Sequence, residues 1–184
     1  MINNCMKKFV QLFEEFNQPK EGTCEFHHHR TTAYAETYTV DMVGKPFYVS
    51  FVKSASFVGV WLREYDTASG ELEQLNSGKP KEIISCVTAI TKDFIERFNP
   101  NNVLILHIPM DNEQGDSPYP NKRARINYRY LSQIGGYSIR MFNIFKHNYI
   151  YTVTVMSKAG NTAKVEPMVD MLEPDFRAKE VQPI

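Results

Sequence analysis

Hydrophobic residues recur along this chain with two periods, one of about 3.6 residues and one of two, and these periods predict its helices and strands. Over Asn3–Asn17 they predict an amphipathic helix, which Pro19 and Gly22 end. The apolar face of this helix is formed by Met6, Phe9, Val10, Phe13 and Phe16. Apolar and polar residues then alternate over Phe47–Phe51 and Phe57–Tyr65, which is typical of strands with one buried face.

The middle of the chain predicts an antiparallel sheet followed by a helix, a strand and a second helix. Residues 31–43, rich in Thr and Tyr, predict a strand that a turn at Gly44-Lys45-Pro46 joins to Phe47–Phe51. Glu71–Leu75 is either a short edge strand or a loop. The later elements are a helix over 79–98, a buried parallel strand over 103–106, a helix over 121–134 and a hairpin of strands over 137–145 and 149–156.

This order predicts an α/β fold class, an α+β mixed sheet in which antiparallel strands precede a helix, a strand, a helix and a terminal β-hairpin. The chain divides into an N-terminal amphipathic helix and linker (1–30), a main α/β domain (31–157) and a C-terminal extension (158–184). We take Phe26–Arg30 as part of the polar linker. The extension has three prolines and short apolar clusters, so it either wraps over the core or becomes ordered on a partner.

Charge and cysteine content reduce the number of functions that the sequence supports. The chain has 21 Lys and Arg and 21 Asp and Glu, so no net charge attracts a polyanion and we do not expect nucleic acid binding. No apolar stretch approaches the roughly 20 residues of a membrane-spanning helix. The cysteines, Cys5, Cys24 and Cys86, match neither a disulfide framework nor a metal ribbon, which favours reduced thiols in a cytoplasm.

Two groups of polar residues have open interpretations. The second predicted helix carries basic residues that form either a solvated face or a site for phosphate or a partner: Lys122, Arg123, Arg125 and Arg129. The run His27-His28-His29 is conspicuous, but adjacent side chains of an extended segment point in opposite directions. No Cys, Asp or Glu stands near it at a ligand spacing, so we predict no metal site.

A pattern of small and aromatic residues marks the second predicted helix and the turn after it: Asn121, Ala124, Tyr128, Leu131 and Gly136-Tyr137. With the order of the elements, this pattern resembles the GNAT acetyltransferase superfamily over residues 31–156. The resemblance implies that Tyr128 is the general acid that protonates the departing thiolate of coenzyme A. Tyr130 takes that role if the helix is rotated.

The resemblance also implies a cofactor loop and a base. The family holds the pyrophosphate of coenzyme A on backbone N–H groups at a helix N-terminus. The corresponding residues here, and hence the implied cofactor contacts, are Ser77, Gly78, Lys79 and Lys81. Pro80 removes one N–H donor, and the same stretch also fits a plain turn into the helix. By position at strand ends, Glu64 and His107 are the candidate bases.

Two functions are consistent with these residues. We favour a non-catalytic or weakly catalytic GNAT-like protein without a cofactor, which acts in assembly or partner binding. The alternative is an acyl-CoA-dependent N-acyltransferase that uses acetyl-CoA. The small aromatic-rich domain also resembles proteins of tailed bacteriophages, which implies a virion component or a protein that acts on the host, in the host cytoplasm or the virion. Its protein contacts are then expected from residues 1–17 and 158–184, with self-association as a further option.

Overall fold

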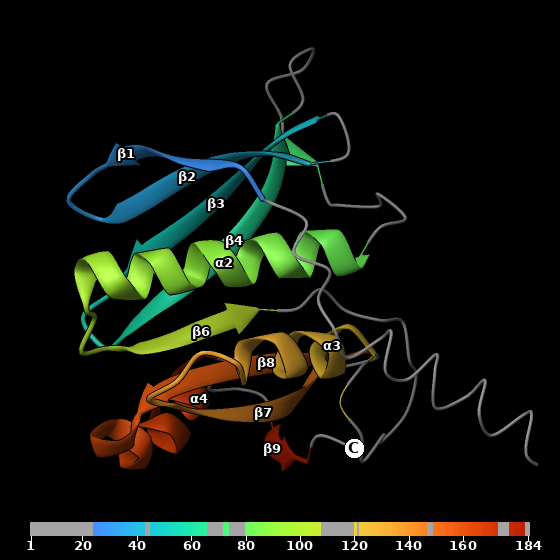
Figure 1. The fold of residues 1–184 in the computed structure, drawn as a ribbon. Helices are drawn as coiled ribbons and strands as arrows, with labels where there is room; N and C mark the ends of the chain where they lie inside the picture. The colour runs from blue at the N-terminus through green and yellow to red at the C-terminus, as the bar shows by residue number, and fades with distance from the viewer. Residues whose placement is uncertain are drawn as a thin grey trace, which may run out of the picture.

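The computed structural model describes residues 24–42, 45–65, 72–73, 80–107, 120, 122–146, 149–172 and 177–182. The helix expected over Asn3–Asn17 lies outside these residues. The described chain forms one nine-stranded mixed sheet with helices on both faces (Figure 1). The predicted class, a mixed sheet of antiparallel and parallel strands combined with helices, is confirmed.

The strands follow the order β1-β2-β3-β4-β6-β8-β7-β9 across the sheet, and β5 pairs with β4 off this path. Only β4 and β6 are parallel among the described pairs. The predicted hairpin arms, parallel strand and closing hairpin are confirmed. The strands are β1 (Phe26–Thr31), β2 (Ala35–Met42), β3 (Lys45–Lys53), β4 (Phe57–Tyr65), β5 (Leu72–Glu73), β6 (Val103–His107), β7 (Tyr137–Lys146), β8 (Tyr149–Lys158) and β9 (Arg177–Val181).

Helix α2 (Pro80–Phe98) covers one face of the sheet and connects the parallel strands β4 and β6 (Figure 1). Its apolar period places Ile90 and Phe94, both at most 1% exposed, against the strands. The helix ends where expected, because Asn99 adopts a φ of 38° and its N–H donates to the carbonyl of Ile95 at 2.8 Å. This left-handed residue closes the last turn, a position that Asn tolerates.

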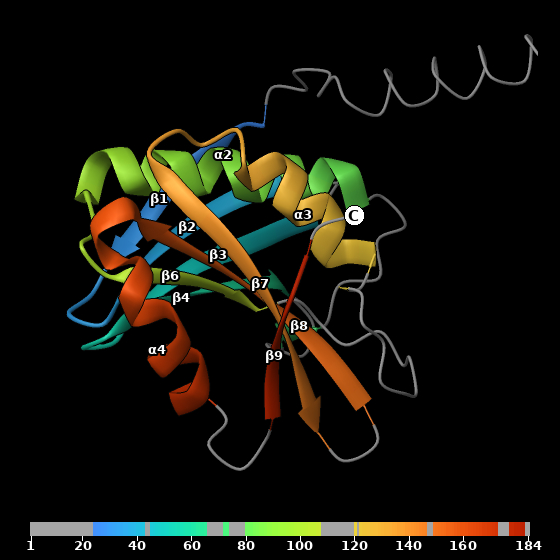
Figure 2. The ribbon, with the colours of Figure 1, turned by 90° about the horizontal axis from the view of Figure 1, so that it is seen from below.

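Helix α3 (Lys122–Leu131) lies beside α2 on the same face (Figure 2). Leu131 and Ile134 join the core that α2 forms with the strands, whereas Ala124 packs on β7 and β9. After the helix, Gly136 has a φ of 81°, which side chains other than glycine rarely adopt. That turn redirects the chain into β7.

The C-terminal segment covers part of the second face. A 3-10 turn, η1 (Ala159–Lys164), leads into α4 (Val165–Leu172), which lies on the side of the sheet opposite α2 (Figure 2). Its Met168 and Val169 are buried in a second core with side chains of β6, β7 and β8. Strand β9 then pairs with β7 and forms one edge of the sheet. Residues of the expected C-terminal extension therefore contribute a helix and a strand to the same body.

An ion cluster fastens this segment to the sheet. Arg140 of β7 donates to Glu180 of β9 at 2.6 and 2.7 Å and to Glu166 of α4 at 2.6 Å. Hydrogen bonding to Arg140, against the effect of burial, lowers the pKa of the Glu180 carboxyl. Two-pronged guanidinium–carboxylate contacts of this kind are geometrically specific, so they fix the register of β9 on β7.

The expected linker at Phe26–Arg30 is wrong, because these residues belong to β1. The strand alternates half-buried and exposed residues and lies at the edge of the sheet, where polar side chains such as those of His27 and His29 face solvent. A turn at Thr32 separates it from β2: the Thr32 N–H donates to the Ala35 carbonyl at 2.8 Å. The Thr- and Tyr-rich run is therefore divided between two strands.

The expectation of reduced thiols is also wrong for two of the cysteines. Cys24, just before β1, is joined to Cys86 of α2 by a disulfide, with Cα atoms 5.4 Å apart across 62 residues of sequence. The distance along the chain hid this pair, because α2 returns over the first strands. In the described part of the chain, no helix is long and apolar enough to cross a membrane.

Candidate functional site

The parallel pair β4 and β6 separates at its carboxyl end. The two strands pair from Phe57 with Val103 to Val60 with Leu106, but β4 continues to Tyr65. Open α/β sheets bind ligands most often outside the carboxyl ends of parallel strands, where neighbouring connections diverge. This opening is therefore the first place in the fold to look for a site.

Strand β5 occupies part of this opening. Glu64 pairs with Phe47 of β3 on one edge of β4 and with Glu73 of β5 on the other. Strand β6 pairs with the same edge of β4 as β5 does. Beyond the end of β6, β5 therefore takes its place beside β4. Three residues of β4, 61–63, separate the last β6 pair from the first β5 pair.

The candidate bases have backbones at this end of the sheet. His107 is the last residue of β6 and pairs with Val153 of β8. Glu64 lies four residues beyond Val60 on β4, which at about 3.3 Å per residue is roughly 13 Å further along the strand. The side chains of Glu64 and His107 lie outside the described residues, so their roles stay predictions.

The predicted acid, Tyr128, packs over β7 and β9. Its half-buried ring packs with Ala124, Met141 and Val181, in a cluster over β7 and β9. These strands are two and three positions beyond β6 in the sheet order. Tyr130 is two residues further along α3, about 200° around the helix, and is also half-buried. The role of Tyr128 as the acid stays a prediction.

The predicted cofactor loop is only partly visible. Ser77, Gly78 and Lys79 lie outside the described residues, as does the side chain of Lys81. Pro80 is the first residue of α2, so the helix begins with a residue that has no N–H to offer an anion. The cofactor contacts implied by the resemblance stay predictions.

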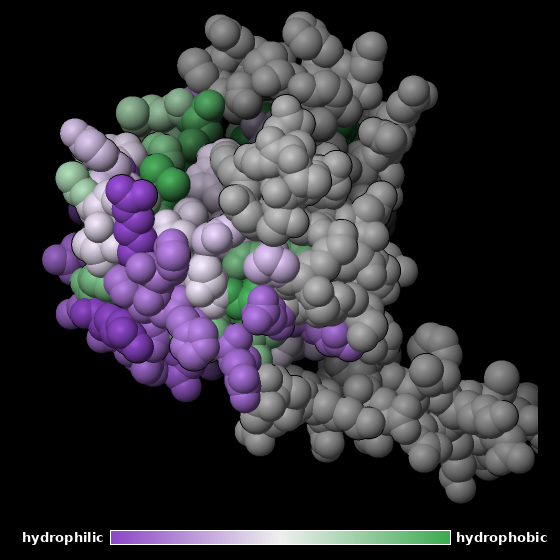
Figure 3. All heavy atoms as spheres, turned by 90° about the horizontal axis from the view of Figure 1, so that it is seen from above, coloured by the Kyte–Doolittle hydropathy of each residue, from purple (hydrophilic) through white to green (hydrophobic). Residues whose placement is uncertain are grey.

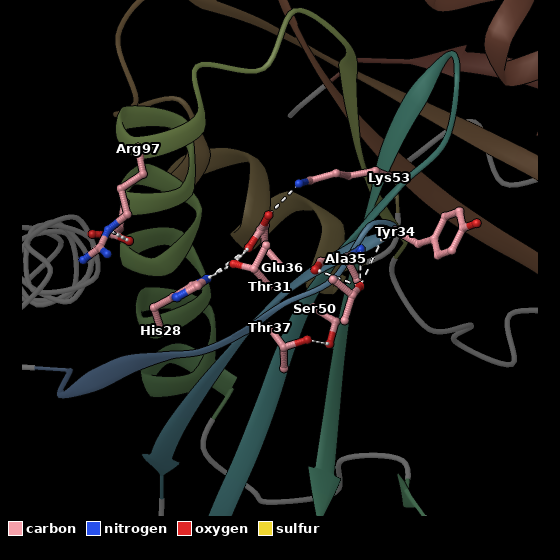
Figure 4. A network of polar contacts seen from close by, with 11 residues as sticks. His28, Thr31, Tyr34, Ala35, Glu36, Thr37, Ser50, Lys53 and Arg97 are labelled. Atoms are coloured by element: carbon pink, nitrogen blue, oxygen red, sulfur yellow. Dashed lines mark hydrogen bonds and ion pairs between the residues drawn. The ribbon is translucent and has the colours of Figure 1, made fainter.

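A buried carboxylate that the sequence analysis did not select lies on the α2 side of the outer strands (Figure 4). Glu36 of β2 is 1% exposed. It accepts hydrogen bonds from His28 Nε2 at 3.0 Å, Thr31 Oγ1 at 2.6 Å and Lys53 Nζ at 2.5 Å. Burial opposes ionisation, but the three bonds outweigh it and hold the pKa of the Glu36 carboxyl below its ordinary value.

Aromatic side chains surround this carboxylate and connect it to α2. The rings of His28 and Tyr38 are 5.1 Å apart, and Lys53 Nζ lies 5.4 Å from the centre of the Phe98 ring. Burial, and then the neighbouring Asp93 carboxylate, raise the pKa of the Tyr38 hydroxyl. Among the described residues, the buried hydroxyl of Tyr38 has no hydrogen-bond partner at ordinary hydrogen-bond geometry.

This network holds neighbouring strands together. The carboxylate oxygens of Glu36 already receive three donors, which joins β1, β2 and β3 beneath the end of α2. Within the described residues, no group of three or more His, Cys, Asp or Glu is arranged to hold a metal ion. The site can be recognised from the pairing of β1 with β2, because that register places Thr31 opposite Glu36.

A second set of buried polar residues lies beneath α3. Thr152 of β8 donates to Asn143 of β7 at 2.8 Å, and both are at most 1% exposed. Thr154, two residues further along β8, is fully buried, and its hydroxyl has no hydrogen-bond partner among the residues that the structure describes. Asn127 of α3 is 6% exposed. These side chains give the sheet under α3 a polar centre.

Comparison with known proteins found no match to this chain among family models, curated proteins or solved structures.

Proposed function

We propose that the protein is a GNAT-like scaffold that acts by binding a protein partner, without catalysis of its own. The observation that carries this proposal is the pairing of β5 with β4. A cofactor in the opening of the parallel pair needs the exposed edge of β4, and the chain's own strand already takes that edge at Glu64 and Tyr65.

Two further features support a role without catalysis. Tyr128 packs over β7 and β9, so the residue expected to protonate a thiolate is committed to a hydrophobic cluster. Helix α2 begins at Pro80, which removes a donor from the terminus that would hold a pyrophosphate. Each feature weakens one contact that acyl transfer from coenzyme A requires.

The partner is a protein of a virion or of an infected host, which follows from the resemblance to small proteins of tailed bacteriophages. The disulfide between Cys24 and Cys86 favours the virion or another oxidising environment over a reducing cytoplasm. We assign the contacts to residues 1–17 and 158–184. In the second segment, Met171 of α4 is 69% exposed and offers an apolar contact.

An N-acyltransferase is the second candidate. It is favoured by the order of β4, α2, β6, α3 and the β7–β8 hairpin, with β8 between β6 and β7, and by a parallel pair that separates at its carboxyl end. In this candidate acetyl-CoA enters at residues 61–63, and Tyr130 replaces Tyr128 as the acid.

Unfolding in urea with and without acetyl-CoA separates the two candidates. A ligand at about 100 times its dissociation constant adds roughly 2.7 kcal/mol to the free energy of unfolding. We expect no change at millimolar acetyl-CoA. An increase of that size, lost when 3′-dephospho-CoA replaces the cofactor, would overturn the proposal and support the transferase.

Partner binding is tested by cross-linking in the cells that produce the protein. The variant Met171→Glu is compared with Lys164→Glu, a change at an exposed residue of the neighbouring turn. We expect a cross-linked partner that is lost only in Met171→Glu. Equal yields from both variants would remove α4 from the contact surface.

A further inference from the structure

The two edges of the sheet are fastened differently. Strand β1, at one edge, follows Cys24, which a disulfide joins to α2. Its His28 and Thr31 also bond the buried carboxylate of Glu36. Figure 3 views the molecule from the side of β1, and hydrophilic residues cover much of the described surface there. Strand β9, at the other edge, has no cysteine and pairs only with β7 among the described strands.

Few apolar side chains hold β9 in place. Of the β9 side chains that the structure describes, only Val181 is buried, at 3% exposure, and it packs with Met141 of β7. Ala178 is half-buried against the second core, whereas Lys179 and Glu180 are exposed. The hydrophobic effect scales with the apolar area removed from water, so these two small side chains give β9 a weak apolar attachment.

The other attachment of β9 is the ion cluster around Arg140. The side chain of Glu180 is 37% exposed, and that of Glu166 is 68% exposed. Ion pairs that water reaches contribute little to stability, and salt screens them. A strand held in this way opens locally at a smaller free-energy cost than the body of the sheet, which stays folded when the strand leaves.

We propose that β9 is an exchangeable strand, which at high protein concentration pairs with β7 of a second copy of this chain and forms a strand-swapped dimer. The second copy fits because its β9 offers β7 the same contacts, Glu180 for Arg140 and Val181 for Met141. Exchange of an identical element makes no new kind of contact, so it is a low-cost route to a dimer. The exchange is reciprocal, and it therefore closes at two copies.

The length of the connection before β9 determines where the two copies meet. Residues 173–176 lie between Leu172, the last residue of α4, and Arg177, the first of β9. A connection of this length spans at most about 18 Å. In the dimer, the end of α4 in each copy therefore lies within that distance of the β7 edge of the other copy. Met171, 69% exposed at this end of α4, supplies apolar surface where the copies meet.

The test reverses one charge in each of two full-length chains. Arg140→Glu places a carboxylate opposite Glu180, and Glu180→Arg places a guanidinium opposite Arg140, so each variant alone has like charges across its own β7–β9 pair. In an equimolar mixture, exchange of β9 between the two variants gives opposite charges at both pairs. Sedimentation of the mixture should show about tenfold more dimer than either variant alone, because two repulsive contacts become attractive.

Two controls locate the exchange at β9. The double variant Arg140→Glu/Glu180→Arg restores opposite charges within one chain and should sediment as the unmodified protein does. Glu166→Arg makes the same charge change as Glu180→Arg, but on α4, which stays with its own copy. Its mixture with Arg140→Glu should therefore give no added dimer.

Three outcomes would overturn the proposal. One is a mixture of Arg140→Glu and Glu180→Arg with no more dimer than the separate variants. Another is an equal gain in the mixture with Glu166→Arg, which assigns the association to a surface other than β9. The third needs no variant to fold: it is an unmodified chain that stays monomeric up to millimolar concentration. All three are measured on the isolated protein, so they do not depend on the proposed partner or on acetyl-CoA.

Discussion

Reduction of the Cys24–Cys86 disulfide should cost this protein a large share of its stability. The bond closes a loop across 62 residues. For a loop of that length, the chain-entropy relation gives a loss of about 14 cal/mol/K in the unfolded chain, or about 4 kcal/mol at 25 °C. Domains unfold with only about 5–15 kcal/mol, so the reduced protein should be marginal. Cys86 is 8% exposed, so after reduction its thiol stays in the core as a small apolar group.

The assay is urea unfolding followed by the emission of Trp61, with and without dithiothreitol. We expect the midpoint to fall on reduction, and we expect Cys24→Ser to reproduce the fall without reductant. A thiol titration of the unreduced, unfolded chain should find one group, Cys5, of the three cysteines. Three titratable thiols, or a difference below about 1 kcal/mol between the two conditions, would refute the reasoning.

Three other changes test the core, the sheet and the C-terminal segment. The lowered pKa of Glu36 means that its ionised form stabilises the fold above the ordinary value of 4.5, and this contribution is lost as pH falls through the folded value. Glu36→Gln should therefore flatten the fall in unfolding free energy in acid, and an unchanged slope would contradict this. Gly59→Val should displace the Trp61 ring, because Nε1 of that ring lies 3.0 Å from the position of the added Cβ, and a changed emission maximum of Trp61 would report the displacement. Met168→Ala should lower the free energy of unfolding by about 2–5 kcal/mol, whereas Met171→Ala, on the exposed side of the same helix, should change it by less than about 0.5 kcal/mol. Equal losses from the two variants would show that α4 does not pack in the core.

The sequence predicted those elements whose hydrophobic period is long and regular. Strand β4 was expected over Phe57–Tyr65 and has those bounds, and α2 ends at the Asn99 position that the pattern indicated. Strand β1 was missed because histidines have little strand preference and because four of its six residues are exposed at an edge of the sheet. Helix α4 was missed because its apolar cluster is short, and a helix of 8 residues is stable only where it packs.

The candidate site was harder to predict because it depends on strand register. His28 and Lys53 are 8 and 17 residues from Glu36, and no local spacing connects them. The disulfide had the same difficulty, since its cysteines meet only after α2 folds back over β1. The expected roles of Tyr128, Glu64 and His107 were assigned by likeness of a helix pattern and by strand ends, which do not state where each side chain points.

The disulfide also changes how the protein would respond to mechanical force. A chain pulled from its two ends can lengthen only outside the loop between Cys24 and Cys86, because the covalent bond carries the load past it. Those 62 residues, at up to about 3.4 Å each, hide roughly 210 Å of contour length. Strands β1 to β4 lie inside the loop and cannot be drawn out by this force, whereas β7, β8 and β9 lie outside it and can be pulled apart.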